Sequence, residues 1–207
     1  MLFESALLIA ALASALALRP WRMLAGGALV TPLLGTLVLL PWVWALPTLH
    51  ATPLQLQWSG ACLVVLMLGW PLAVPVLTLV AALACLLAPA MAWQQALGLA
   101  VWQGVVPATL ALLLGALVRR CIGPHLFVYV LGRAFLGTVV CVFLAGLLSQ
   151  WAGHTLPAVE NDLSIVARWL MAWGDGFLTS MLCAIFVAYH PRWLATWSDA
   201  LYLHKPL

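Results

Sequence analysis

Three charged side chains lie inside apolar stretches of the sequence that are each long enough to cross a membrane. They are Arg133, Arg168 and Asp175. Arg168 and Asp175 are two helical turns apart, so they are expected on one face of a helix, with Asp175 near mid-bilayer and Arg168 near the outer edge. Charges at such depths are energetically expensive and by default indicate a functional site with a charged partner.

Arg133 is the predicted partner of Asp175. The two residues belong to consecutive, antiparallel stretches, so the long arginine side chain can reach the carboxylate. The ion pair would either fix the packing of the last two helices or line the path of a substrate, and the residues leave both interpretations open. Gly174 and Gly176 flank Asp175, and we expect both to allow close approach of a neighbouring backbone.

Metal chemistry has weaker support in the sequence. None of the five histidines forms an HxxxH or HxxE pair, and the five cysteines are scattered singly, with no CxxC. The cysteines therefore indicate small buried side chains rather than a zinc site. His50 and His154 are expected outside the membrane, where they could meet over the mouth of a helix bundle and contact a metal.

The composition identifies the setting of these residues. Of the 207 residues 66% are hydrophobic and 6% are charged, against roughly 25% charged in an ordinary soluble domain. This predicts an all-α, polytopic membrane helix bundle with no separate catalytic domain. The basic residues are too few and too dispersed for nucleic-acid binding. One buried aspartate, without a paired carboxylate or a Ser-His arrangement, argues against an enzyme.

The distribution of Lys and Arg predicts the number of membrane spans. Plain spans are expected at about 3–18, 27–46, 96–118, 126–150 and 164–189, and the stretch 58–88 is too long for one span. Two short helices hinged at Gly69-Trp70-Pro71 would give seven spans, with all basic groups inside and Glu4 and the acidic loop outside. The predicted orientation has the N-terminus outside and the C-terminus in the cytoplasm.

The predicted hinge has two interpretations. Pro71 and Pro75 remove backbone donors, so the broken helix either lines a cavity, as in many transporters, or is a tight helical hairpin without a site. Residues 1–190 are expected to form the transmembrane domain. Residues 191–207 are expected to form a cytoplasmic interfacial tail, in which Trp193, Leu194, Trp197 and Leu201 follow helical spacing.

Three blocks of the sequence resemble a known family. They are "LMLGWPLAV" (66–74), "PHLFVYVLGRAFLGT" (124–138) and "GDGFLTSMLCAIFVAYHPRWLATWSDALYL" (174–203). They are similar to energy-coupling-factor ABC transporter permeases, relatives of the substrate-binding membrane component of cobalt and nickel uptake systems.

The resemblance implies a multi-pass protein of the bacterial cytoplasmic (inner) membrane with seven helices. It also implies a second transmembrane subunit and cytoplasmic ATPases as partners. No phosphate-binding GxxxxGK[ST] loop occurs in the chain itself. The implied cargo is a small solute or a divalent metal ion such as cobalt or nickel.

Two positions depart from the metal-transporting members. Leu2 stands where they carry a histidine after the initiator methionine, and Gln57 precedes the Gly-Trp-Pro region where they carry another histidine. Gln57 is therefore a weak candidate ligand, because an amide binds transition metals less well than imidazole. The alternative function is an accessory or assembly subunit that has lost metal binding.

Overall fold

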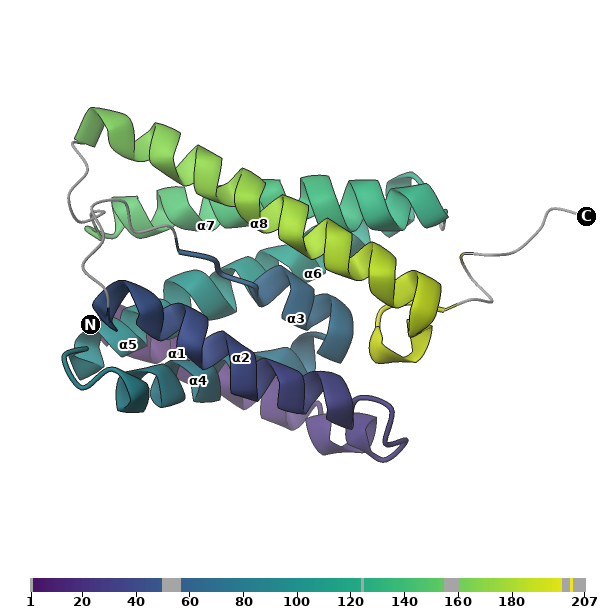
Figure 1. Cartoon of the computed structure of the whole chain (residues 1–207), viewed down its shortest axis with the longest axis horizontal. Coiled ribbons are helices and arrows are strands. Elements are labelled where there is room, and N and C mark those ends of the chain that lie inside the picture. The colour runs from purple at the N-terminus through teal and green to yellow at the C-terminus, as the bar shows by residue number, and fades with distance from the viewer. Residues whose placement is uncertain (1, 50–56, 124, 155–160, 199–201, 203–207) are drawn as a thin grey trace, which may run out of the picture.

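The computed structural model of the chain describes residues 2–49, 57–123, 125–154, 161–198 and 202. Within these ranges every regular element is helical (Figure 1). The elements are α1 (Leu2–Ala17), η1 (Pro20–Leu24), α2 (Val30–Leu49), α3 (Ala61–Leu68), α4 (Trp70–Leu87), α5 (Trp93–Gly98), the π-helix η2 (Leu99–Val105), α6 (Val106–Cys121), the π-helix η3 (Val128–Leu136), α7 (Gly137–Trp151), α8 (Asn161–Tyr189) and η4 (Pro191–Trp193).

In the described part of the chain, five helices are long and apolar enough to cross a membrane, which confirms the helix-bundle class. They cover Val30–Leu49, Trp70–Leu87, Trp93–Cys121, Val128–Trp151 and Leu163–Tyr189. The third and fourth are continuous through the π-helices η2 and η3. Helix α1 is also apolar but is shorter; it packs on α4 and η2.

The bundle has two ends, which we name by one residue each. The Glu4 end holds the start of α1, the end of α2, the start of α5 and the end of α7 (left in Figure 1). The Gly69 end holds η1, the end of α6, the end of α8 and η4 (right in Figure 1).

The stretch 58–88 is broken into two helices at Gly69, as predicted. Gly69 has φ 73°, a backbone conformation that disfavours other residues. Pro71 lies in the first turn of α4, where its missing N–H has no partner to lose. A Cβ on Gly69 would lie 2.9 Å from the methyl group of Met23, so this turn is a tight corner at the Gly69 end.

Helix α3 is too short to cross a membrane. Its 8 residues span about 12 Å, less than half of the ~30 Å hydrocarbon layer. All of them are apolar and buried, because α3 is surrounded by α2, α4, α6 and α8. The chain enters this helix through residues 57–60, which have no regular structure, so a second break lies before α3, inside the bundle.

The tail differs from the predicted amphipathic helix in its described part. After η4 the chain continues without a regular helix through residue 198. Ala195 N–H donates to Met67 O at 2.9 Å, and Thr196 N–H donates to Leu66 O at 3.3 Å. The last carbonyls of a helix need such donors, so the tail folds back and caps α3. Leu194 is buried as a result.

The two glycines beside Asp175 play different roles. A Cβ on Gly176 would lie 2.6 Å from Val139 Cγ2 and 3.2 Å from Phe135 O, so Gly176 permits the close packing of α8 on η3 and α7. A Cβ on Gly174 would meet nothing within 4 Å. The prediction of close packing is therefore confirmed for Gly176 and wrong for Gly174, because Gly174 faces outward.

Gly176→Ala should destabilise the protein by about 1–3 kcal/mol, because the new methyl group overpacks the α7–α8 contact. Gly174→Ala is the matched control and should be neutral or stabilising by up to about 1 kcal/mol, since alanine is the better helix former. Equilibrium unfolding in detergent measures both changes. Equal losses from the two substitutions would contradict this packing.

Candidate functional site

The Asp175 carboxylate bonds to the backbone at the second break in the chain. Its Oδ2 accepts a hydrogen bond from Ser59 N–H at 3.1 Å, and its Oδ1 accepts one from Gly60 N–H at 3.2 Å. The residue is only 2% exposed. These two donors immediately precede α3, so the carboxylate caps the N-terminus of the short helix, where the helix dipole favours a negative charge.

The neighbouring polar groups of the entry segment are also satisfied by distant parts of the chain. Trp44 Nε1–H donates to Ser59 O at 3.1 Å. The Ser59 hydroxyl donates to Gln103 O in η2 and accepts from Ala61 N–H. The side-chain amide of Gln103 donates to Gln57 Oε1. Irregular backbone can exist within an apolar bundle only where such partners replace water.

The predicted ion pair between Arg133 and Asp175 is not formed. Arg133 points toward α6, where its Nε would lie 2.6 Å from a Cβ on Gly115, and its Cζ lies 5.7 Å from the Tyr129 ring centre. The Asp175 carboxylate is bonded to the backbone before α3 instead. The backbone N–H groups of Ser59 and Gly60 donate to the carboxylate, in place of the arginine donors that the sequence predicted.

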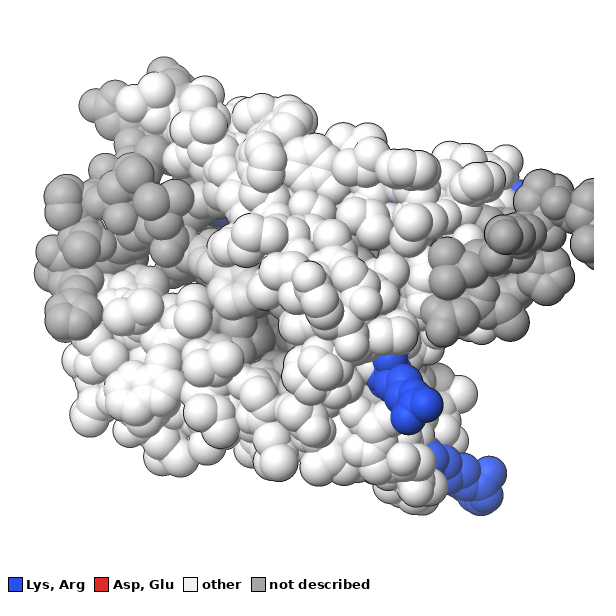
Figure 2. Space-filling model, turned by 45° about the vertical axis from the view of Figure 1, so that its right-hand side comes forward, with Lys and Arg blue, Asp and Glu red and all other residues white. Residues whose placement is uncertain are grey.

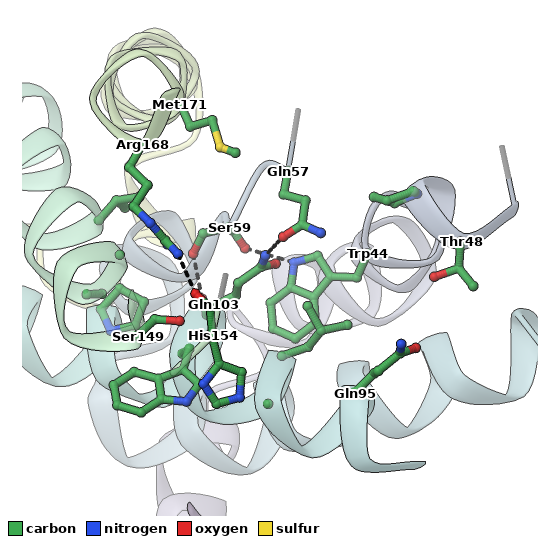
Figure 3. A pocket seen from close by; sticks show the side chains of 18 of the residues that line it. Trp44, Thr48, Gln57, Ser59, Gln95, Gln103, Ser149, His154, Arg168 and Met171 are labelled. Atoms are coloured by element: carbon green, nitrogen blue, oxygen red, sulfur yellow. Dashed lines mark hydrogen bonds between the residues drawn. The ribbon is translucent and has the colours of Figure 1, made fainter. Parts of the chain in front are cut away.

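A cavity of about 770 Å³ extends from Asp175 to the Glu4 end. Most of the bundle is apolar, but polar and charged side chains from several helices line this cavity together with apolar ones (Figure 3). Gln94 and Gln95 are exposed at its mouth. The other polar lining residues include Glu4, Thr48, Gln57, Ser59, Gln103, Ser149, His154, Arg168 and Asp175.

Glu4 forms a cluster with His154 and Trp102 at the outer part of this cavity. Trp102 Nε1–H donates to Glu4 Oε1 at 2.8 Å, and His154 Nε2 lies 3.0 Å from the same oxygen. Glu4 is only 6% exposed. The sequence predicted Glu4 at the outer end of the first span, but not that it faces inward and joins His154.

Arg168 lines the same cavity as Asp175, which confirms that they share one face of α8. One guanidinium nitrogen donates to His154 O at 2.8 Å. Its Nε has no hydrogen-bond partner among the residues that the structure describes. Because Arg168 lines the cavity, its guanidinium is placed to contact an acceptor oxygen of a solute there.

Four of the predicted site residues meet in this cavity: Gln57, His154, Arg168 and Asp175. Arg133 does not line it, and His50 lies outside the described residues. Within the described ranges no three His, Cys, Asp or Glu side chains are grouped as a metal site. Trp44, Trp102 and Gln103 were not predicted; the glutamine in the middle of an apolar span was the one signal that could have identified it.

Asp175→Asn should lower the free energy of unfolding by about 2–3 kcal/mol, because an amide can accept from one of the two buried N–H groups and opposes the other. Ser180→Ala is the control on the same helix. Among the described residues its hydroxyl donates to Phe177 O of that helix alone, so the change should stay within about 0.5 kcal/mol.

A double-mutant cycle with Arg133→Gln separates this role from the predicted ion pair. The two substitutions should be additive within about 0.5 kcal/mol, as for residues without contact. A coupling energy above about 1 kcal/mol would show that Asp175 and Arg133 interact after all.

Comparison with protein-family models, with curated proteins and with solved structures finds no match for this chain. The cavity and the residues that line it are therefore the basis for inferring function.

Proposed function

We propose that the chain is the solute-binding membrane subunit of an energy-coupling-factor type transporter. The observation that carries this proposal is the cavity of about 770 Å³, whose lining combines apolar side chains with polar and charged groups, inside an otherwise apolar bundle. Its volume falls within the range of roughly 300–1,000 Å³ that is typical of small-molecule sites. In apolar surroundings such a lining is retained where it binds or conducts a polar solute.

The proposal includes seven membrane crossings, with the Glu4 end outside. Helix α1 and the combined segment 57–68 supply the two crossings that are not long regular helices. Discontinuous membrane-spanning segments, in which irregular chain leads into a short helix, commonly form the binding site near the midplane of a transporter. Asp175 and Ser59 form the inner limit of the cavity, at that break.

Helix α3 closes the path from the cavity to the Gly69 end. Its eight buried apolar residues occupy the centre of the bundle, and the tail covers its last turn. A solute bound at Asp175 or Arg168 would therefore be reached from the Glu4 end only. Release to the other side would require movement of α3, with energy from the partner ATPases that the family resemblance implies.

A divalent metal such as cobalt or nickel is the second candidate cargo. The observation that favours it is the approach of His154 and Glu4 to 3.0 Å within the cavity, since imidazole and carboxylate are both metal ligands. Gln57 is bonded to Gln103 instead of facing this pair. A polar organic solute uses more of the lining, including Arg168 and the amides, and is the first choice.

A non-transporting accessory subunit is the competing function. It would use Asp175 only to hold α3, and it would need no solute in the cavity. A binding experiment on the purified protein distinguishes the two functions.

A thermal-shift screen of the purified full chain should find stabilising ligands among small polar solutes, with Co²⁺ and Ni²⁺ as separate members of the panel. A ligand at 100 times its Kd stabilises the folded state by about 2.7 kcal/mol. Arg168→Gln should weaken binding of an organic solute about tenfold or more, because a charge-assisted hydrogen bond is lost.

Leu170→Ala is the control for this experiment, since Leu170 is 62% exposed on the same helix and lies outside the cavity. It should leave binding unchanged. Stabilisation by Co²⁺ or Ni²⁺ that is lost in His154→Ala would select the metal cargo. If the screen finds no ligand whose stabilising effect is lost in Arg168→Gln or His154→Ala, the result would support the accessory subunit.

Cysteine labelling tests the orientation. Cys121 is exposed in the last turn of α6, at the Gly69 end, so a membrane-impermeant maleimide should label it only after cells are permeabilised. Ala152→Cys, at the other end and in a Cys121→Ser background, should be labelled in intact cells. The opposite pattern would invert the proposed orientation.

A further inference from the structure

Arg133 lies in a second, separate pocket, and no acidic side chain among the described residues balances its charge there. The pocket is lined by Arg119, Tyr129, Arg133 and Tyr202, together with Gly115, Val118, Gly123 and Val128. Arg133 Nε is buried and has no hydrogen-bond partner among the described residues. A guanidinium in an apolar bundle needs an acceptor for its donors.

The acidic residues with described side chains cannot supply that acceptor. The chain has five acidic residues. Glu4 bonds to Trp102 and His154 at the opposite end, and Asp175 bonds to the backbone before α3. The side chains of Glu160, Asp162 and Asp199 lie outside the described residues.

Arg133 packs directly on Gly115 of α6. A Cβ at this position would lie 2.6 Å from Arg133 Nε and 2.9 Å from its Cζ, so the glycine lets the guanidinium lie against the helix backbone. Tyr129 OH bonds to the Thr196 hydroxyl, which fixes the ring beneath the cation. The guanidinium is therefore held with its ring partner on one side and Arg119 at the rim.

The size and place of the pocket indicate the kind of anion that fits. Its volume is about 10 Å³, which admits a single oxygen and excludes a whole solute. It lies at the Gly69 end, where five arginines are found: Arg19, Arg22, Arg119, Arg120 and Arg192. That end is turned toward the viewer in Figure 2, and the prominent basic atoms lie there on an otherwise mostly uncharged surface.

We propose that the pocket binds one phosphate oxygen of an anionic phospholipid headgroup. Arg133 supplies the buried Nε–H donor, Arg119 supplies a second charge at the rim, and Tyr129 and Tyr202 form part of the wall of the pocket. Basic pockets between helices at a membrane surface commonly bind anionic headgroups. The site is distinct from the solute cavity and does not require that the chain transports anything.

The test measures retained phosphatidylglycerol by native mass spectrometry of the full chain from nanodiscs of phosphatidylcholine with and without phosphatidylglycerol. The wild type should retain phosphatidylglycerol, and Arg133→Gln should lower its affinity about tenfold or more. Arg119→Gln, at an exposed position that folding should tolerate, should reduce it in the same direction. Arg120→Gln is the matched control, since Arg120 does not line the pocket, and should bind like the wild type.

Two further arms decide the source of the anion. Inorganic phosphate added to phosphatidylcholine nanodiscs should leave the melting temperature unchanged; stabilisation by phosphate that removes the lipid preference would replace the lipid with a free anion. Asp199→Asn should also leave lipid retention unchanged. A lipid preference that is absent in the wild type and gained in Asp199→Asn would show that Asp199 fills the pocket, and it would overturn the proposal. Equal lipid retention by the wild type, Arg119→Gln and Arg133→Gln would overturn it as well.

Discussion

The bond between the Asp175 carboxylate and two backbone N–H groups is the interaction on which the centre of the bundle depends. In an apolar environment an interrupted helix has unpaired donors, and each of them is expensive to bury. A buried carboxylate is equally expensive without donors. Each group removes the penalty of the other, so α3 can begin in the middle of the bundle instead of at its surface.

The position of this break also creates the cavity. Residues 57–60, before α3, form no helix. The cavity lies beside them, and side chains from this segment and from the surrounding helices line it. Those side chains include polar and charged ones, from Arg168 on α8 to the amides of Gln57 and Gln103, together with apolar ones such as Leu99 and Met171. On the Gly69 side of the break, the buried apolar residues of α3 fill the centre of the bundle. One structural device therefore produces both an open half and a closed half.

Much of the fold could be predicted from the sequence, but the partners of the charges could not. Hydropathy and proline placement identified the long helices and the break at Gly69, because these depend on local composition. The shared face of Arg168 and Asp175 followed from helical periodicity alone. The predicted ion pair of Asp175 with Arg133 was wrong, because only charged side chains were considered as partners of the carboxylate. The actual donors are backbone N–H groups 115 and 116 residues away in the chain. The inward-facing Glu4 was missed for a similar reason, since its partners come from distant helices.

Amide hydrogen exchange at Ser59 and Gly60 is the most direct measurement of the central interaction. Both amides should exchange slowly in the wild-type protein and in Arg133→Gln, because the carboxylate holds them in a buried bond. In Asp175→Asn, the exchange of at least one of them should become markedly faster, while the amides of α8 itself remain protected. Fast exchange in the wild type, or equal protection in the wild type and Asp175→Asn, would contradict the role of Asp175 at the start of α3.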